Sequence, residues 1–240
     1  MKSLIYGATG GIGSSLARVL VAKGQKVHLV SRDAAKLAVL AQELNAGFTA
    51  GDVREADTFV RAYADAGEGL SGLAYCVGSI NLKPFHRLTK QDFLDDFLLN
   101  ACGAAQAVQA ALPGLKAYEG TSSVLLFSTV AVAQGFSAHA SVAMAKGAVE
   151  GLTLALAAEL APKIRVNCIA PSLIKTPLAK ALISSQLMAT AIAAMHALQR
   201  LGEPEDIAPL AGLLLSEEAG WITGQIIGVD GGRATLRPKG

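Results

Sequence analysis

Seven short apolar segments alternate with stretches of helical period, and this alternation restricts the fold more than any other feature. The segments are residues 3–8, 26–31, 47–53, 73–78, 123–129, 164–170 and 225–230. Most of them are rich in Val, Ile and Leu on both faces, which is typical of parallel strands buried on both sides. No linker or internal repeat divides the chain. The sequence therefore predicts an α/β fold, a single doubly wound domain over residues 1–240 with helices on both faces of a parallel sheet.

The composition of the chain indicates which partners and which cellular compartment to expect. Hydrophobic residues make up 52% of the chain, charged residues 17%, and the net charge is +2. This balance gives no reason to expect a nucleic acid or a membrane as partner. Cys76, Cys102 and Cys168 are odd in number and lack metal-ligand spacing, so we expect no metal site and a reducing compartment. With no signal peptide and no apolar run of membrane-spanning length found, the prediction is a soluble cytoplasmic protein.

Small and polar residues follow six of the predicted strands. These strand ends are "GATGGIG", "SRD", "GDV", "CVGS", "STVAV" and "APSLIKTP". In doubly wound sheets, ligands bind beyond the carboxyl ends of the strands. The six ends together predict one continuous ligand groove.

Three glycines mark the first of these strand ends. Gly7, Gly11 and Gly13 follow a strand and open a helix. Glycines at such a turn allow the backbone to approach a pyrophosphate, and the helix N-terminus offers free N–H groups to the anion. The turn predicts a dinucleotide site, with a tight strand-to-helix turn that binds nothing as the alternative.

The end of the second strand is where dinucleotides are distinguished. An acidic residue there would bind the ribose 2′-hydroxyl, but this chain has Ser31 and Arg32. Arg32 can form charge-assisted hydrogen bonds with a 2′-phosphate. We interpret Asp33 as the N-cap of the next helix. The sequence favours NADP(H), with NAD(H) as the alternative.

A single cation stands in an apolar, small-residue helix at "HASVAMAKGAVEG". Lys146 has Ala and Met neighbours, and an ammonium beside apolar atoms is costly unless a polar or anionic group meets it. Either Lys146 reaches outward to solvent along the helix edge, or it serves a site.

The chain resembles the short-chain dehydrogenase/reductase family from "YGATGGIG" to "WITGQIIGVDGG". Further shared stretches are "GDV", "LLNACGAAQAVQAALP", "AKGAVEGLTLALAAELAPKIRVNCIAPSLIKTPLA" and "LGEPEDIA". The resemblance implies a Rossmann-type fold with a seven-stranded parallel sheet. It also implies a nicotinamide cofactor, a small-molecule substrate and a homotetramer or homodimer.

The resemblance implies a catalytic set that is only partly present. Lys146 matches the lysine of the family's Y-x-x-x-K motif, which binds the nicotinamide ribose and lowers the pKa of a catalytic tyrosine, but Val142 stands at the tyrosine position. Thr129 occupies the place of the active-site serine, with Ser128 beside it. Asn100 matches the asparagine that anchors a water of the proton relay.

The cofactor contacts implied by the resemblance follow the six strand ends. They are Gly7, Thr9, Gly10, Gly11, Ile12, Gly13, Ser31, Arg32, Asp52, Val53, Cys76, Val77, Gly78, Asn100, Lys146, Pro171, Ser172, Ile174 and Thr176. The family's N-N-A-G is here Tyr75-Cys76-Val77-Gly78, and its Pro-Gly is Pro171-Ser172.

Three interpretations remain open at the level of sequence. In the first, the protein is an NADP(H)-dependent oxidoreductase that interconverts a carbonyl and an alcohol with another proton donor or none. In the second, it is a non-catalytic NADP-binding sensor or partner subunit. In the third, Val142 is an engineered knock-out of an active enzyme. His139, three residues before Val142, is a candidate donor because the imidazole suits proton transfer near neutrality. The alternative for His139 is a loop or capping residue.

Residues 171–200 resemble the family's substrate lid. Leu173, Leu178, Leu182 and Met188 predict an apolar pocket, although a lid packed on the body of the protein would have the same pattern. We interpret Met195 and His196 as helix surface or interface, and Trp221 as an interface or core anchor.

Overall fold

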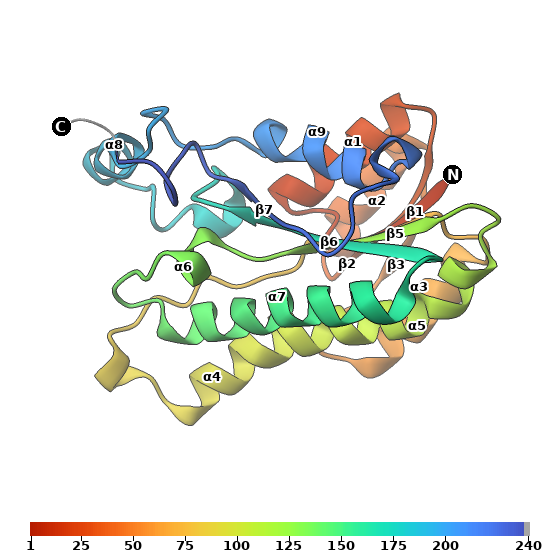
Figure 1. Ribbon diagram of the computed structural model, residues 1–240, viewed down its shortest axis with the longest axis horizontal. Helices are drawn as coiled ribbons and strands as arrows, with labels where there is room; N and C mark the ends of the chain where they lie inside the picture. The colour runs from red at the N-terminus through yellow and green to blue at the C-terminus, as the bar shows by residue number, and fades with distance from the viewer. Residues whose placement is uncertain (238–240) are drawn as a thin grey trace.

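The computed structural model describes residues 1–237 and contains the predicted sheet (Figure 1). Its order is β3-β2-β1-β4-β5-β6-β7, and every neighbouring pair is parallel. The strands are β1 (Lys2–Tyr6), β2 (Lys26–Ser31), β3 (Gly47–Ala50), β4 (Gly72–Tyr75), β5 (Ser122–Phe127), β6 (Ile164–Pro171) and β7 (Ile226–Val229). All seven predicted strands are confirmed. Several end earlier than predicted, because their last residues turn out into the edge where ligands bind in such folds.

Helices cover both faces of the sheet, as predicted (Figure 1). One face carries α1 (Gly11–Ala22), α2 (Ala34–Leu44) and α9 (Pro204–Leu214). The other carries α3 (Ala56–Ala66), α5 (Gly103–Ala117) and α7 (Ala140–Leu160), with α4 (Lys90–Phe97) against α7. Shorter elements are α6 (Val130–Ala133), α8 (Gln186–Ala194), η1 (Phe85–Arg87), η2 (Leu98–Cys102), η3 (Pro177–Ala179) and η4 (Glu217–Ala219).

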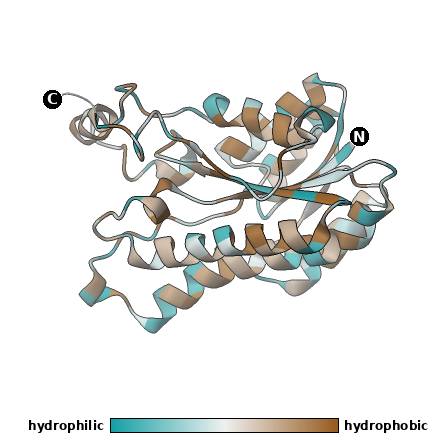
Figure 2. Ribbon diagram, viewed as in Figure 1, coloured by the Kyte–Doolittle hydropathy of each residue, from teal (hydrophilic) through white to brown (hydrophobic). Residues whose placement is uncertain are grey.

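Two hydrophobic cores result, one on each side of the sheet. Along β1, Leu4 and Tyr6 enter the core beneath α3, α5 and α7, whereas Ile5 enters the core beneath α1, α2 and α9. Successive strand residues point to opposite faces, so a strand covered on both sides must be apolar throughout. Figure 2 shows this as brown along the central strands and the helix faces that meet them.

The length and hydropathy of α7 correct one expectation from the sequence. Among the described residues, this one helix is long and apolar enough to cross a membrane. However, α7 packs against β6 and α4 and buries Ser141, Lys146 and Thr153. These contacts are those of a core helix.

The last strand lies at an open edge. Among the described residues, β7 pairs only with β6. Trp221, shortly before β7, is fully exposed. The core-anchor interpretation of Trp221 is therefore wrong, and the interface interpretation stays open.

The glycine-rich turn brings β1, α1 and β4 into direct backbone contact. Gly7 has a φ of +75°, and a Cβ on it would lie 2.8 Å from the carbonyl carbon of Cys76. A Cβ on Gly13 would lie 2.3 Å from the Gly7 carbonyl oxygen. Only glycine permits these approaches, so the turn positions the start of α1 at the carboxyl edge of the sheet.

We predict that Gly13→Ala destabilises the fold, because the new methyl group would meet backbone atoms that cannot move independently. Overpacking of this kind costs roughly 1–3 kcal/mol. Urea unfolding should show this loss. The control is Gly135→Ala, since that Cβ meets no atom within 4 Å, and it should change stability by less than about 0.5 kcal/mol. Equal stabilities of the two variants would contradict the packing argument.

Candidate active site

A cavity of about 530 Å³ opens beyond the carboxyl ends of β4, β5 and β6. Its inner wall is formed by residues 76–79, 127–130 and 171–174. Its outer wall is apolar and includes Leu178, Leu182, Met188 and Ile192 from the region of η3 and α8. A concave, largely apolar site with a few polar groups is typical of small-molecule pockets.

The structure brings together most residues predicted for the chemistry and the nicotinamide end. Those that line the cavity are Ile12, Cys76, Val77, Gly78, Ser128, Thr129, His139, Val142, Lys146, Pro171, Ser172, Ile174 and Thr176. The predicted apolar residues Leu173, Leu178, Leu182 and Met188 line it as well. The other predicted residues lie in or beside the glycine-rich turn and the ends of β2 and β3, and Asn100 lies behind Gly78.

Lys146 is buried at the inner wall, with 7% of its surface exposed. Its Nζ donates a hydrogen bond of 2.8 Å to the Phe127 carbonyl oxygen at the end of β5. Burial lowers the pKa of Lys146 to about 8, because desolvation disfavours the charged form. The outward-reaching interpretation is therefore wrong. The ammonium has three N–H donors, and this bond occupies one of them.

Asn100 is held in the π-helical turn η2 and is also buried. Its Nδ2 donates to Ser79 Oγ at 2.8 Å and to the Asp96 carbonyl oxygen at 2.8 Å. Its Oδ1 has no hydrogen-bond partner among the described residues and lies 3.2 Å from where a Cβ on Gly78 would stand. Lys146 Nζ lies 3.3 Å from the same point. A side chain at Gly78 would therefore meet both the Asn100 Oδ1 atom and the Lys146 ammonium.

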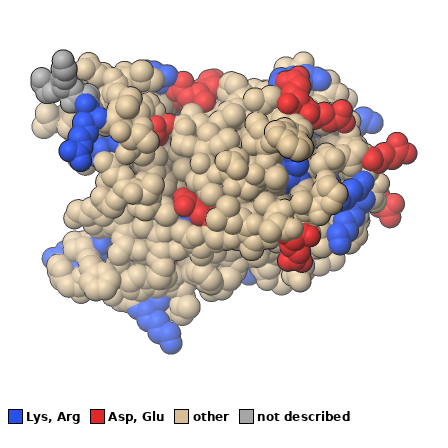
Figure 3. All heavy atoms as spheres, viewed as in Figure 1, with Lys and Arg blue, Asp and Glu red and all other residues tan. Residues whose placement is uncertain are grey.

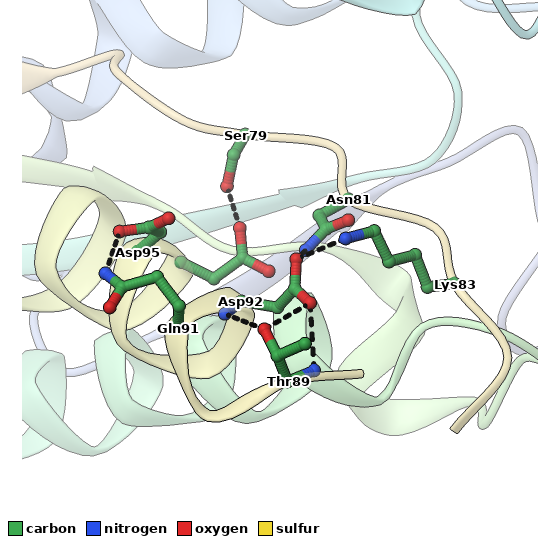
Figure 4. Close-up of polar contacts among 8 residues, drawn as sticks. Ser79, Asn81, Lys83, Thr89, Gln91, Asp92 and Asp95 are labelled. Atoms are coloured by element: carbon green, nitrogen blue, oxygen red, sulfur yellow. Dashed lines mark hydrogen bonds and ion pairs between the residues drawn. The ribbon is translucent and has the colours of Figure 1, made fainter. Parts of the chain in front are cut away.

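A network that the sequence did not reveal fixes the loop between β4 and α4 (Figure 4). Ser79 donates a hydrogen bond of 2.6 Å to the buried carboxylate of Asp96. Further along, Asp92 accepts from Lys83, Asn81 and Thr89. The Lys83 ammonium holds the pKa of Asp92 well below its usual range. The loop that carries Ser79 to the cavity is therefore tied to the first turn of α4.

The two neighbouring hydroxyls of the "ST" pair have different surroundings. Ser128 Oγ donates to Glu150 Oε1 at 2.6 Å, on α7. Thr129 is the N-cap of α6, and its Oγ1 accepts from the Ala131 N–H at 3.3 Å. The Thr129 hydroxyl hydrogen remains free to donate. Thr129 is thus the hydroxyl available to a ligand.

Val142 and His139 lie on one wall of the cavity at the start of α7. Val142 is 6% exposed and contributes only methyl groups. His139 is the N-cap residue of α7, which agrees with the alternative prediction of a loop or capping residue. Its side chain makes no capping hydrogen bond. Its Nδ1 lies 2.7 Å from the Ser137 carbonyl oxygen, and its ring packs edge-on against Phe136.

His196 contradicts the surface interpretation. It is 2% exposed, lines the cavity, and bonds the Ile192 carbonyl oxygen through Nδ1 and Ser172 Oγ through Nε2, each at 2.8 Å. The reason is that α8 ends at Ala194, and the chain then turns back toward the end of β6. Met195, beside it, is half exposed and also lines the cavity.

The opposite end of the groove has the features of an anion site. Gly10 is the N-cap of α1 and provides no side-chain cap, so the first N–H groups of this helix can meet a ligand. Thr9 Oγ1 lies 2.6 Å from Ser31 Oγ. Arg32 is exposed and forms no hydrogen bond or ion pair within residues 1–237.

Asp33 is the N-cap of α2, as predicted. Its carboxylate accepts from the Lys36 N–H at 3.1 Å and pairs with the Lys36 ammonium at 3.0 Å. Those contacts lower the pKa of Asp33. The carboxylate is therefore occupied by the first turn of α2, whereas the adjacent guanidinium is available.

Comparisons with known proteins agree with this arrangement. A family model described as enoyl-(acyl carrier protein) reductase matches residues 7–234. A tropinone reductase homolog of Arabidopsis thaliana is 33% identical over 240 residues, covering 96% of this chain and 90% of that protein. The L-xylulose reductase of Bos taurus is 33% identical over 233 residues, covering 96% and 95%.

A solved structure shares the fold over nearly the same length. A short-chain type dehydrogenase/reductase from Mycobacterium ulcerans superposes with a TM-score of 0.90 at 32% sequence identity, covering 99% of this chain and 90% of that one. The likeness extends from the glycine-rich turn to the last strand.

Burial of Lys146 predicts a pH dependence of stability. Its folded-state pKa of about 8 lies below the ordinary value of 10.5. Between these values the unfolded chain holds a proton that the folded chain has released, so stability rises with pH. We expect the unfolding free energy of wild type, relative to Lys146→Met, to rise by roughly 2–3 kcal/mol from about pH 8 to about pH 10.

Urea unfolding at several pH values measures this difference. The comparison with Lys146→Met cancels other groups that titrate in the same range. Lys23→Met, which removes an exposed lysine, serves as control and should show no such trend against wild type. A difference between wild type and Lys146→Met that does not change with pH would contradict the burial argument.

Proposed function

The chain belongs to the short-chain dehydrogenase/reductase family, and on that premise we propose that it is an NADP(H)-dependent oxidoreductase that interconverts a carbonyl and an alcohol on a small substrate. The observation that carries the proposal is the buried Lys146 ammonium at the inner wall of the cavity, with N–H donors left over beyond its bond to Phe127. A buried cation with spare donors is costly unless a ligand meets it.

The residues present fit a nicotinamide dinucleotide. The turn at Gly7 and Gly13 has no room for a Cβ, and the uncapped N-terminus of α1 offers N–H groups to a pyrophosphate. Lys146 would hold the nicotinamide ribose by donating to its hydroxyls, with Asn100 Oδ1 as an unpaired acceptor nearby. The bound cofactor supplies the hydride.

The preference for NADP(H) over NAD(H) is supported by the end of β2. Arg32 is exposed and free there, whereas the nearby carboxylate of Asp33 is engaged with Lys36. A guanidinium forms strong hydrogen bonds with a phosphate, and an occupied carboxylate neither repels that phosphate strongly nor binds a ribose hydroxyl.

The substrate side of the cavity favours a largely apolar carbonyl compound. Leu178, Leu182 and Met188 form an apolar wall, with Arg233 also at the cavity, and we propose residues 171–200 as the lid that carries this wall. Thr129 would orient the substrate oxygen by donating its free hydroxyl hydrogen. Ser128 is committed to Glu150 and has a supporting role.

The proton-donor position is the altered part of the site. Val142 cannot transfer a proton, and His139 is a candidate replacement because it lines the same cavity. The second candidate function is NADP binding without catalysis. The one observation that favours it is Val142, which stands at the position of the catalytic tyrosine. The third interpretation, an engineered Val142 in an otherwise active enzyme, predicts the same cavity. The available Thr129 hydroxyl in that cavity favours catalysis.

We further propose a homotetramer or homodimer. Apolar side chains are exposed on α4, η2 and α7, namely Leu94, Phe97, Leu98, Met144 and Leu154. In Figure 3 much of the face over α7 carries neither acidic nor basic residues. The open edge of β7 and exposed Trp221 form a second such region. The three free cysteines support a cytoplasmic location.

The first test concerns cofactor choice. We expect wild type to bind NADPH more tightly than NADH, and Arg32→Ala to reduce that preference by roughly ten- to a hundred-fold, since hydrogen bonds to charged groups contribute about 1.5–3 kcal/mol. Calorimetry measures both affinities. Arg18→Ala removes the same charge from an ion pair with Glu43 and should leave the preference unchanged. Equal wild-type affinities for NADPH and NADH would contradict the proposed preference for NADP(H).

The second test restores a phenol. Val142→Tyr should increase NADPH consumption with some member of a panel of ketones, aldehydes and quinones, because a positioned acid contributes about 10²–10⁴-fold. The nearby Lys146 charge would lower the phenol's pKa. The cavity beside Val142 leaves room for the ring. Val142→Phe adds similar bulk without the hydroxyl and should give no gain. A folded, NADPH-binding Val142→Tyr without any gain would favour the non-catalytic function.

A further inference from the structure

Ser172 and His196 form a polar pair in a largely apolar part of the cavity. His196 Nε2 lies 2.8 Å from Ser172 Oγ, and both residues line the cavity. Ser172 follows β6 directly, and His196 follows α8. The pair therefore joins the inner wall of the cavity to the lid region.

The hydrogen bonds of His196 fix where its protons lie. The Ile192 carbonyl oxygen, 2.8 Å from Nδ1, can only accept, so Nδ1 carries a hydrogen. In the neutral ring Nε2 is then the acceptor, and Ser172 donates its hydroxyl hydrogen to it. In the protonated ring Nε2 donates to Ser172 Oγ, and the serine hydrogen is free to point into the cavity. The ring can thus exchange a proton only through Nε2.

Strand pairing brings together the two strand ends that precede Thr129 and Ser172. β5 and β6 pair in parallel up to Phe127 and Ile169, and the Ser128 N–H continues the pairing by donating to the Ile169 carbonyl oxygen at 2.8 Å. β5 ends at Phe127 and β6 ends at Pro171, so Thr129 and Ser172 each lie just beyond the end of one of two paired strands. Both hydroxyls border the cavity that Lys146 also lines.

A second, smaller cavity of about 140 Å³ lies on the far side of the pair. Ser172 and His196 line both cavities. The small one is also bordered by Asp230 and by the ion pair of Arg200 with Asp206. The pair therefore borders both cavities, and charged side chains line only part of the smaller one.

We propose that Ser172 is the proton donor of this site and that His196 supplies the proton to it, in place of the missing phenol. This inference rests on the proposed function. Hydride addition to a carbonyl carbon leaves an oxyanion that needs one proton. The O–H bond of Ser172 breaks as the product's O–H bond forms, and the serine oxygen takes the Nε2 proton of the imidazolium. The neutral His196 that results keeps its Nδ1 hydrogen. Alcohol oxidation runs through the same steps in reverse.

His139 is the competing donor, and its surroundings differ. Its Nδ1 meets the Ser137 carbonyl oxygen, its ring packs on Phe136, and no described residue bonds its Nε2. It touches no hydroxyl that borders the cavity. His139→Gln is therefore a matched control for His196→Gln.

The first measurement needs no cofactor. Phenylmethylsulfonyl fluoride labels serines whose hydroxyl proton can be taken by a neighbouring base. The serine Oγ bonds to the sulfur, fluoride leaves, and the base takes the hydroxyl proton. Mass spectrometry should find the label on Ser172, at least about tenfold slower in His196→Gln and unchanged in His139→Gln. Nitrogen-15 NMR of the full chain should show His196 with its hydrogen on Nδ1 when neutral. A hydrogen on Nε2, or labelling that does not depend on His196, would overturn the proposal.

The second measurement is turnover with NADPH and the carbonyl panel. Ser172→Ala and Ser172→Gly should lower kcat by about 10²-fold or more, and the loss should persist at saturating NADPH. His196→Gly should lose kcat likewise and regain part of it with added imidazole, which a purely structural role would not allow. Wild-type turnover in Ser172→Ala overturns the donor role and leaves the proposed function intact. If wild type turns over no substrate of the panel, the donor role of Ser172 and the proposed oxidoreductase function are both contradicted.

Discussion

Parallel pairing of seven strands is the constraint on which the rest of this structure depends. It brings the carboxyl ends of all strands to one edge, so residues as distant in sequence as Ile12, Thr129 and Pro171 line one cavity. The close approach of Gly7 to the Cys76 backbone lets β1, α1 and β4 meet there. The Lys146–Phe127 hydrogen bond then anchors α7 to the end of β5, where the chemistry would take place.

The sequence predicted the parts of the molecule that local patterns specify. Short segments bounded by turn residues located all seven strands, and most of them are rich in Val, Ile and Leu because a strand covered on both faces has no polar side. The glycine spacing located the turn at Gly7, since a φ of +75° and the lack of room for a Cβ restrict that position to glycine. Lys146 stood out because its helix neighbours are apolar, but the sequence left open whether it is buried, and the structure decides this.

What the sequence could not supply were contacts between distant segments. His196 was predicted at the surface because nothing near it in the chain differs from an amphipathic helix, and its partner Ser172 is 24 residues away. The same holds for Asp96, whose buried carboxylate is explained only by Ser79 on the preceding loop. A signal did exist at Ser172, since a hydroxyl where the family has glycine requires a polar partner if it is buried.

Three buried polar groups lie in or behind the inner wall of the cavity. Lys146, Asn100 and Asp96 each lie at less than a tenth exposure, and the Asn100 Oδ1 and Asp96 Oδ2 atoms have no hydrogen-bond partner in residues 1–237. Unpaired buried polar atoms destabilise a fold, so a wall with only a packing role would be more stable with apolar residues. None of these groups depends on a phenol at Val142 for its position. The inner wall can therefore remain organised with valine at position 142, and a proton donor at Ser172, on the same wall, would complete the proposed chemistry without disturbing it.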